Sequence, residues 1–469
     1  MLSEIKNIKR LLIFFAIVIL SLQKPISGVA EEATSPIIVC LDTEAKLIPV
    51  YLTRFDSKES SFSPEYHKQL EKILQFDLSN NGMTSIVPST SEREGFAKAE
   101  EFNIRPSDSS WKALGAYYVI KIKVNNKQLS ARLFSANSDN VKSVDNIELT
   151  GLVNSDRKKI HQLSDTLHRA LFNTRGIAST KILYTIKNRE NNGAWCSELW
   201  ECDYDGANAH KLSLSESGYV VTPVYMPPKT GFNSGTVFYV SYQTGQPKIY
   251  YQSLTENALP RRLNLMRGNQ LMPAISRARD KIAFICDLTG NPDLFIQPFN
   301  PEGGPLGKPY QIFSARLATQ GSPAFSPDGT RIAFVSNKDG SARIYVMDVP
   351  APGISLKDIK AKLLTKCNKE SSAPAWSPDG TKLAYCSMVK GVRQIWVYDF
   401  TTKEEKQLTQ GPNNKENPTW APNSLHLAFN TSDTGSCELF MINLNQPNAI
   451  KISSGAGEKR FPSWEPRSE

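Results

Sequence analysis

Histidine side chains, which commonly act as general bases and metal ligands, are few and scattered in this chain of 469 residues. Two of the five, His161 and His168, stand seven residues apart in a run with helical spacing, so they would share one face of a helix. A zinc site usually requires a third protein ligand close by. We therefore interpret the pair as solvated surface residues.

The segment Asp203-Tyr204-Asp205-Gly206 offers two carboxylates that could hold a calcium ion. It also falls where a turn must join two predicted strands, and we prefer the turn, because Asp and Gly are typical turn residues. The sequence has no Gly-x-Ser-x-Gly nucleophile elbow, P-loop, Gly-x-Gly-x-x-Gly, His-Glu-x-x-His motif or EF-hand loop. We expect no catalytic residue, no cofactor and no metal, although a propeller fold does not by itself exclude catalysis.

The seven cysteines are an odd number, so in an exported protein at least one is unpaired or pairs between chains. Cys196 and Cys202 could bridge across a hairpin. Cys286 and Cys386 lie inside apolar strand patterns, and we interpret both as small buried hydrophobic residues.

The first thirty residues have the three-part plan of a secretory signal peptide. Basic residues at positions 6, 9 and 10 precede the apolar run Leu11 to Leu20, and Gly28-Val29-Ala30 supplies small residues for a cut after Ala30. The alternative, an uncleaved anchor, would need about 20 apolar residues. No later run is long enough to span a membrane, so we expect the mature protein to be soluble and exported.

The formal net charge of +9 does not by itself exclude any class of binding partner. A nucleic-acid-binding protein would gather its basic residues into a patch or stripe, whereas acidic and basic residues are interleaved here. We therefore expect no nucleic-acid partner.

Residues 31–175 mix strand patterns with amphipathic helices and predict an α/β domain. Ser63-Pro64 is a helix start, with an N-cap followed by proline at the first helical position, and Asn80-Asn81-Gly82 ends that helix. We expect residues 91–108 to be a charged loop. Further expected elements are strands at 37–41, 47–52 and 144–149, a hairpin of 117–124 and 128–134, a short helix from 107–108 to about 115, and a helix at about 155–174, with Ile160, Leu163, Leu167, Ala170 and Leu171 facing inward.

Helical patterns stop after Gly176, and a repeat of short strands takes their place. Its clearest turn is Ser326-Pro327-Asp328-Gly329, which recurs as Ser377-Pro378-Asp379-Gly380. Each copy begins at a marker proline, and successive markers are 44 to 51 residues apart, the range of propeller blades. The markers are Pro223, Pro273, Pro323, Pro374, Pro418 and Pro462.

Four strands can be placed in each repeat, which is typical of a β-propeller. The stretch from Lys181 to Ser213 supplies only a second, third and fourth strand, and the chain ends with a lone first strand at Pro462-Ser463-Trp464. We therefore predict, for residues 176–469, an all-β six-bladed propeller closed by the C-terminal strand. This closure would pair edge strands that otherwise invite aggregation.

The loops that enter each blade should meet at one mouth of the central channel, and they end just before each marker proline. Most of their residues are polar and uncharged, which suits adaptable hydrogen bonding to a protein; the alternative is plain solvated loops. The candidates are Asn269, Gln270, Met272, Gln320, Ser322, Ser371, Glu416, Asn417 and Arg460.

The chain resembles the TolB family, the periplasmic component of the Tol-Pal system, over nearly its whole mature length. The turns alone mark many propellers, but the first blade and the closing strand are more specific. The residues that carry the resemblance are Trp111 to Gly115, Glu198-Leu199-Trp200, Asp203 to Gly206, the Ser-Pro-Asp-Gly turns and Phe461-Pro462-Ser463-Trp464.

The resemblance implies a non-enzymatic adaptor that helps to maintain outer-membrane integrity during cell division. Such proteins bind the peptidoglycan-associated lipoprotein Pal through the propeller, which by position assigns Asn269, Met272 and Gly321 to that contact. They engage the inner-membrane protein TolA through the mature N-terminus, here Glu31 to Ser35 with Glu31 and Glu32. This segment is shorter and more polar than the family pattern.

Two other functions remain open. The chain could be a propeller scaffold for other envelope proteins, or the non-catalytic half of an envelope enzyme. The missing nucleophile motif counts against a peptidase.

Overall fold

A computed structural model describes residues 47–103, 108–136, 141–190, 193–212, 218–232, 234–255, 258–433 and 436–468. All of these residues belong to one compact unit. Within them, no helix is both long and apolar enough to cross a membrane. The expected signal peptide with its cut after Ala30, the segment with Glu31 and Glu32, the strand at 37–41 and Cys40 lie outside the described residues.

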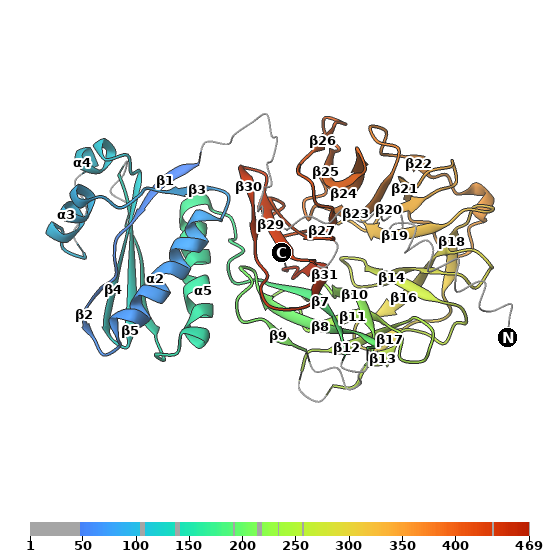
Figure 1. Cartoon of the computed structure of the whole chain (residues 1–469), viewed down its shortest axis with the longest axis horizontal. Coiled ribbons are helices and arrows are strands. Elements are labelled where there is room, and N and C mark those ends of the chain that lie inside the picture. Colours follow the sequence, from blue (N-terminus) through green and yellow to red (C-terminus); the bar gives the residue numbers. More distant parts are fainter. Residues whose placement is uncertain are drawn as a thin grey trace, which may run out of the picture. The chain divides into compact units, whose positions relative to one another are not determined.

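The N-terminal part of the described chain is an α/β domain built on a six-stranded sheet (Figure 1). The strand order is β3-β1-β4-β5-β6, and β2 also pairs with β4. The strands are β1 Ile48–Leu52, β2 Asp56–Ser60, β3 Thr84–Ile86, β4 Tyr118–Asn126, β5 Gln128–Ser135 and β6 Val141–Glu148. The helices are α2 Pro64–Ser79, α3 Ser91–Ala99, α4 Asp108–Ala113 and α5 Val153–Phe172.

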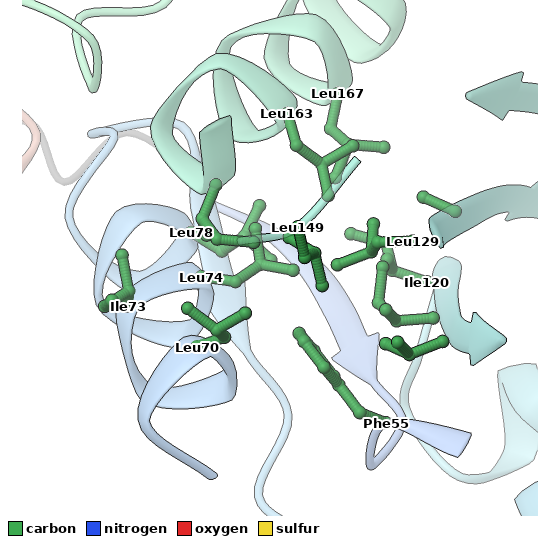
Figure 2. Packing of buried hydrophobic residues seen from close by; sticks show 14 of the residues in the cluster. Phe55, Leu70, Ile73, Leu74, Leu78, Ile120, Leu129, Leu149, Leu163 and Leu167 are labelled. Atoms are coloured by element: carbon green, nitrogen blue, oxygen red, sulfur yellow. The ribbon is translucent and has the colours of Figure 1, made fainter. Parts of the chain in front are cut away.

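The core of this domain lies between the sheet and the helices α2 and α5. Figure 2 shows Leu70 and Leu74 of α2 and Leu163 of α5 directed toward Ile120 and Leu129 of the sheet. Alternate residues of β4 and β5 enter this core, as the period of a strand requires. Burial of these side chains, at about 25 cal/mol per Å² of apolar surface, holds both helices on the sheet.

Local sequence explains where the helices begin. The Ser63 side chain accepts a hydrogen bond from the Tyr66 N–H at 3.3 Å, which confirms the predicted cap of α2. The interpretation of residues 91–108 as a loop is wrong for 91–99, because the Thr90 hydroxyl caps α3 in the same way. None of the α3 residues is fully buried, so its apolar spacing gave little signal. Ala170 of α5 is exposed, contrary to expectation.

The C-terminal part is the predicted propeller, with six antiparallel sheets (Figure 1, green to red). Five sheets follow one another along the chain. They are β10 Val220–Tyr225, β11 Thr236–Ser241, β12 Lys248–Ser253 and β13 Arg261–Arg262; β14 Gln270–Ile275, β15 Lys281–Cys286, β16 Asp293–Asn300, β17 Gly304–Pro305 and β18 Tyr310–Phe313; β19 Gln320–Phe325, β20 Arg331–Ser336, β21 Arg343–Asp348 and β22 Lys362–Leu363; β23 Ser371–Trp376, β24 Lys382–Val389, β25 Val392–Asp399 and β26 Glu405–Gln407; β27 Lys415–Trp420, β28 His426–Thr431, β29 Leu439–Asn443 and β30 Gln446–Lys451.

The sixth sheet joins the two ends of the propeller and confirms the predicted closure. Its order is β31-β7-β8-β9, with β31 Glu458–Trp464, β7 Lys181–Arg189, β8 Trp195–Asp203 and β9 His210–Lys211. Trp464 lies opposite Ile182 in an antiparallel pair, and its indole donates to the Thr180 hydroxyl at 2.8 Å. The first strands of neighbouring blades contact one another all the way round, so the ring is complete.

The repeated Ser-Pro-Asp-Gly segment is the predicted tight turn. In the copy at Ser326, the Gly329 N–H donates to the Ser326 carbonyl at 2.8 Å, and the Asp328 carboxylate accepts from the Thr330 N–H at 3.1 Å. Gly329 has φ +68°, which a glycine adopts without strain. These contacts are local, so the turn is structural.

The structure answers one question that the sequence left open, the Cys196–Cys202 bridge, and corrects one interpretation, that of His161 and His168 as solvated residues. Cys196 and Cys202 do not form a disulfide; they lie six residues apart on the same strand, β8, about 20 Å at the usual rise per residue, and both thiols are free. His161 and His168 are not solvated, because α5 turns both inward and leaves them 1% and 4% exposed. Cys286 and Cys386 are buried, as expected.

The partner of His161 is Asp77, a buried carboxylate on α2. The Asp77 carboxylate lies 2.8 Å from His161 Nδ1 and accepts a hydrogen bond from the Tyr204 hydroxyl, also at 2.8 Å. Tyr204 belongs to the turn between β8 and β9, so this carboxylate joins the α/β domain to the propeller. Burial raises the pKa of Asp77. Burial alone would lower the pKa of His161, but the hydrogen bond and charge of Asp77 raise it.

We expect Tyr204→Phe to lower the free energy of unfolding by about 1 to 3 kcal/mol, because it leaves the buried carboxylate of Asp77 with one donor fewer. Tyr250→Phe in β12 is the matched control, since that hydroxyl makes no hydrogen bond within the described chain; its effect should stay within about 0.5 kcal/mol. Denaturant unfolding of both variants measures the difference. Equal effects would contradict the role of the Tyr204 hydroxyl.

Glu465, which directly follows the closing strand β31, is an acid with a raised pKa. The Glu465 carboxylate accepts from the Lys181 N–H at 3.1 Å, and burial together with the nearby Glu201 carboxylate raises the pKa of Glu465 from 4.5 to about 7. Between these values the folded protein keeps a proton that the unfolded chain releases, so stability falls as the pH rises.

Glu465→Gln should therefore unfold like the parent protein near pH 4 and be more stable near pH 8, by up to about 3 kcal/mol. The exposed Glu404→Gln, on a side chain that is 59% exposed, serves as the control and should show no such pH dependence. Melting temperatures across this pH range test the expectation. A stability gain that is independent of pH would show that folding does not raise the pKa of Glu465.

Candidate functional site

The innermost strand of every blade contains a β-bulge at its marker proline. In each case two residues of the inner strand stand opposite one residue of the second strand, which shifts the register by one. The residue before the proline has a left-handed backbone with φ between +42° and +56°. These six residues, which we call the pre-proline ring, are Thr222, Met272, Ser322, Ala373, Asn417 and Phe461.

An aromatic ring of the second strand lies opposite each bulge. A non-glycine residue at positive φ is strained by about 1 to 3 kcal/mol, so its surroundings must hold it in place. The burial of a large aromatic side chain at the same level of the sheet supplies such packing. The aromatic residues are Tyr184, Tyr239, Phe284, Phe334, Tyr385 and Phe429, none more than 3% exposed.

This pairing was missed from the sequence, although a signal for it exists. In four of the repeats the aromatic residue follows the marker proline by eleven positions, as Phe334 follows Pro323. The spacing marks the level at which the inner strand bulges. Read together, proline and aromatic residue predict the bulge.

The predicted mouth residues lie in strands rather than in loops, which corrects the expected location. Met272 is in β14, Gln320, Gly321 and Ser322 are in β19, and Asn417 is in β27. The inner strand starts before the proline because the bulge lets pairing continue on both sides of it. Of the six residues proposed for lipoprotein contact, Asn269 alone precedes its strand.

Burial divides these candidates into two groups. Gln320 is 2% exposed and Gly321 is buried, so neither residue presents a surface to a partner. Met272, Ser322, Asn417 and Asn269 are partly exposed. Only this second group has the accessibility that a contact surface requires.

Hydrogen bonds connect these residues across neighbouring blades. The Ser322 N–H donates to Met272 Sδ at 3.1 Å, and Asn430 Oδ1 accepts from Asn417 Nδ2 at 2.9 Å and from the Phe461 N–H at 3.2 Å. Asn269 donates twice to Asp287, from its N–H and its side chain, each at 2.7 Å. The surface is therefore held in shape before any partner arrives.

The ring itself has no ionisable side chain. Beside it, Glu416 accepts from Arg393 at 2.9 Å, and Arg460 pairs with Glu458 at 2.9 Å. These charges are neutralised in place, so the arrangement suits recognition of a protein surface better than acid–base chemistry.

One group of described residues has the spacing of a metal site, His161 with Asp203 and Asp205. Their ligating atoms lie within 4.8 Å of one another. However, Arg157 Nη2 donates to Asp205 Oδ2 at 2.7 Å and Arg157 Nε lies 3.8 Å from Asp203 Oδ2, so a guanidinium occupies the place of a cation. The Asp203 to Gly206 segment is a domain contact built on a turn.

Comparison with known proteins places this architecture in a family. A family model described as the TolB beta propeller domain matches residues 168–468. The TolB homolog of Protochlamydia amoebophila is 55% identical over 382 residues, 81% of either chain, and that of Chlamydia trachomatis serovar L2 is 36% identical over 80% of this chain and 78% of its own.

A solved structure agrees with the fold. TolB from Acinetobacter baumannii superposes with a TM-score of 0.71, covering 92% of this chain and 100% of that one, at 19% identity. The likeness supports the architecture alone. Because the family model covers more than half of the chain and a TolB homolog is 55% identical over 81% of it, the chain belongs to the TolB family.

Proposed function

We propose that this chain is a non-catalytic, periplasmic adaptor of a Tol-Pal system. It binds a Pal-like, peptidoglycan-associated lipoprotein at the propeller mouth and so helps to maintain outer-membrane integrity during cell division. The observation that supports the proposal is the pre-proline ring, a set of partly exposed, uncharged residues that the bulges hold in one fixed arrangement. Membership of the TolB family supplies the class of partner.

The proposed contact consists of Met272, Ser322 and Asn417 of the ring together with Asn269. Preorganisation favours binding here, because strands and cross-blade hydrogen bonds leave little backbone freedom to be lost on association. Gln320 and Gly321 would act from below the surface, by shaping β19. The segment Glu31 to Ser35 remains a proposed contact for a TolA-like inner-membrane protein.

A scaffold for other envelope proteins is the second candidate, because an uncharged ring would serve any partner with a complementary surface. Binding to the purified lipoprotein domain separates the two. If a folded chain fails to bind a Pal-like domain from the same envelope, the adaptor proposal is wrong and the scaffold remains.

We expect Met272→Arg to weaken lipoprotein binding at least tenfold, because it places a charge in a contact that excludes water. Its melting temperature should stay close to that of the parent protein, since the side chain is only partly buried. Isothermal titration with the soluble lipoprotein domain gives the affinity.

Leu259→Arg is the matched control. Leu259 is 73% exposed and lies between β12 and β13, on the outer part of its blade. It adds the same charge away from the ring and should leave the affinity unchanged. Undiminished binding by Met272→Arg would remove the ring from the contact.

A further inference from the structure

A cavity of about 420 Å³ opens beside the inner strand β14. Its wall is formed by Thr244 and Gln246, by Lys248 at the start of β12, by Arg262 of β13, and by Leu265 to Gly268, which lie just before β14. Three of the lining side chains, Lys248, Arg262 and Arg267, are cationic. None of them forms an ion pair with a carboxylate within 4.0 Å in the described part of the chain. We call it the basic pocket.

Protein carbonyls hold the cations in position without neutralising them. Lys248 is 4% exposed, and its amine donates to the carbonyls of Gly268 and, at 3.3 Å, Met266. Arg262 Nη2 donates to the same Met266 carbonyl at 3.4 Å, while Arg262 Nε is buried with no acceptor among the described residues. The site therefore keeps unused capacity for an anion.

The nearest acid does not fill this role. Asp287 is close enough to influence Lys248, but its two carboxylate oxygens are engaged by the N–H and the side chain of Asn269, both at 2.7 Å. Burial and the neighbouring Arg262 lower the pKa of Lys248. A buried cation next to a second cation is unfavourable until an anion arrives.

The rim of the pocket points to a protein as the source of that anion. Leu265 is 87% exposed at the edge of the cavity, and the segment that carries it continues through Asn269 to Met272 of the ring. Leu317, also 87% exposed, stands in the corresponding segment before β19. Cations flanked by exposed apolar groups match a protein surface on which a carboxylate stands among apolar side chains.

We propose that the basic pocket receives a carboxylate of the protein that binds the propeller mouth, from an Asp or Glu side chain or a chain terminus. The proposal rests on the proposed function for the identity of the partner, and it deepens that function by naming the chemistry of the contact. Arg262 and Arg267 supply the planar donor pairs that carboxylates accept, and Lys248 supplies a buried point charge.

The test compares the double variant Arg262→Gln/Arg267→Gln with Lys357→Gln/Lys360→Gln, which removes the same charge from exposed positions between β21 and β22. Melting temperatures establish that both are folded. Because Arg262 lies in β13, the single variant Arg267→Gln, on an exposed side chain, provides a second measurement if the double variant is unstable.

Three probes are used, each at low and high salt: the soluble domain of a Pal-like lipoprotein, a fluorescent hexaglutamate peptide, and vesicles of phosphatidylglycerol. We expect the pocket variant to bind the lipoprotein domain about tenfold more weakly and with a shallower salt dependence, while the control variant binds like the parent protein.

The outcomes separate the two proposals. Equal binding of the lipoprotein by parent and pocket variant would overturn the pocket and leave the adaptor function standing. If the parent does not bind the lipoprotein but binds the peptide in a pocket-dependent way, the adaptor function fails and the carboxylate pocket stands with another acidic protein as partner. Pocket-dependent binding to vesicles alone, or no binding to any probe, would overturn the carboxylate proposal.

Discussion

The pairing of β31 with β7 is the interaction on which the rest of the structure depends. It brings together residues such as Trp464 and Ile182 from opposite ends of the propeller, and it converts five complete sheets and one incomplete sheet into a ring. Without it, β7 would expose an unpaired edge. The entropy lost in closing so long a loop grows only slowly with length, so a single well-packed strand suffices to hold the ring.

Closure also determines what the protein presents to its surroundings. Six inner strands at fixed positions each bulge at the same level, and each bulge turns one uncharged residue into the pre-proline ring. A surface built from strands in this way resists deformation, whereas a surface built from loops would have to be ordered on binding. The turn between β8 and β9 is not part of this ring, and it contacts the α/β domain through Tyr204.

Much of this architecture could be predicted because its signals are local. Pro323, the turn at Ser326 and the apolar run after it repeat in the sequence, and the lone strand at Pro462 implied closure. The burial of His161 could not be predicted, because its partner Asp77 is 84 residues away and nothing near either residue marks the pair. The prediction that Gln320 and Gly321 lie in a loop was wrong for a related reason. Proline normally interrupts a strand, and the bulge that accommodates Pro323 depends on Phe334 in the next strand.

The basic pocket illustrates a different limit. Lys248, Arg262 and Arg267 are unremarkable in a sequence whose charges are interleaved, and only the pairing of β12 with β13 brings the first two together. That no acid among the described residues forms an ion pair with them is a property of the folded chain. Charge counts along a sequence therefore understate how positive a local surface can be.

The most direct test of the central claim is backbone hydrogen exchange of the intact chain, measured with and without the soluble domain of a Pal-like lipoprotein. We predict added protection at the start of β14 and β19, around Met272 and Ser322, and none in the turns at the other ends of these strands, at 276–280 and at Ser326-Pro327-Asp328-Gly329. Protection confined to those turns or to the α/β domain would contradict the claim that the pre-proline ring is the binding surface.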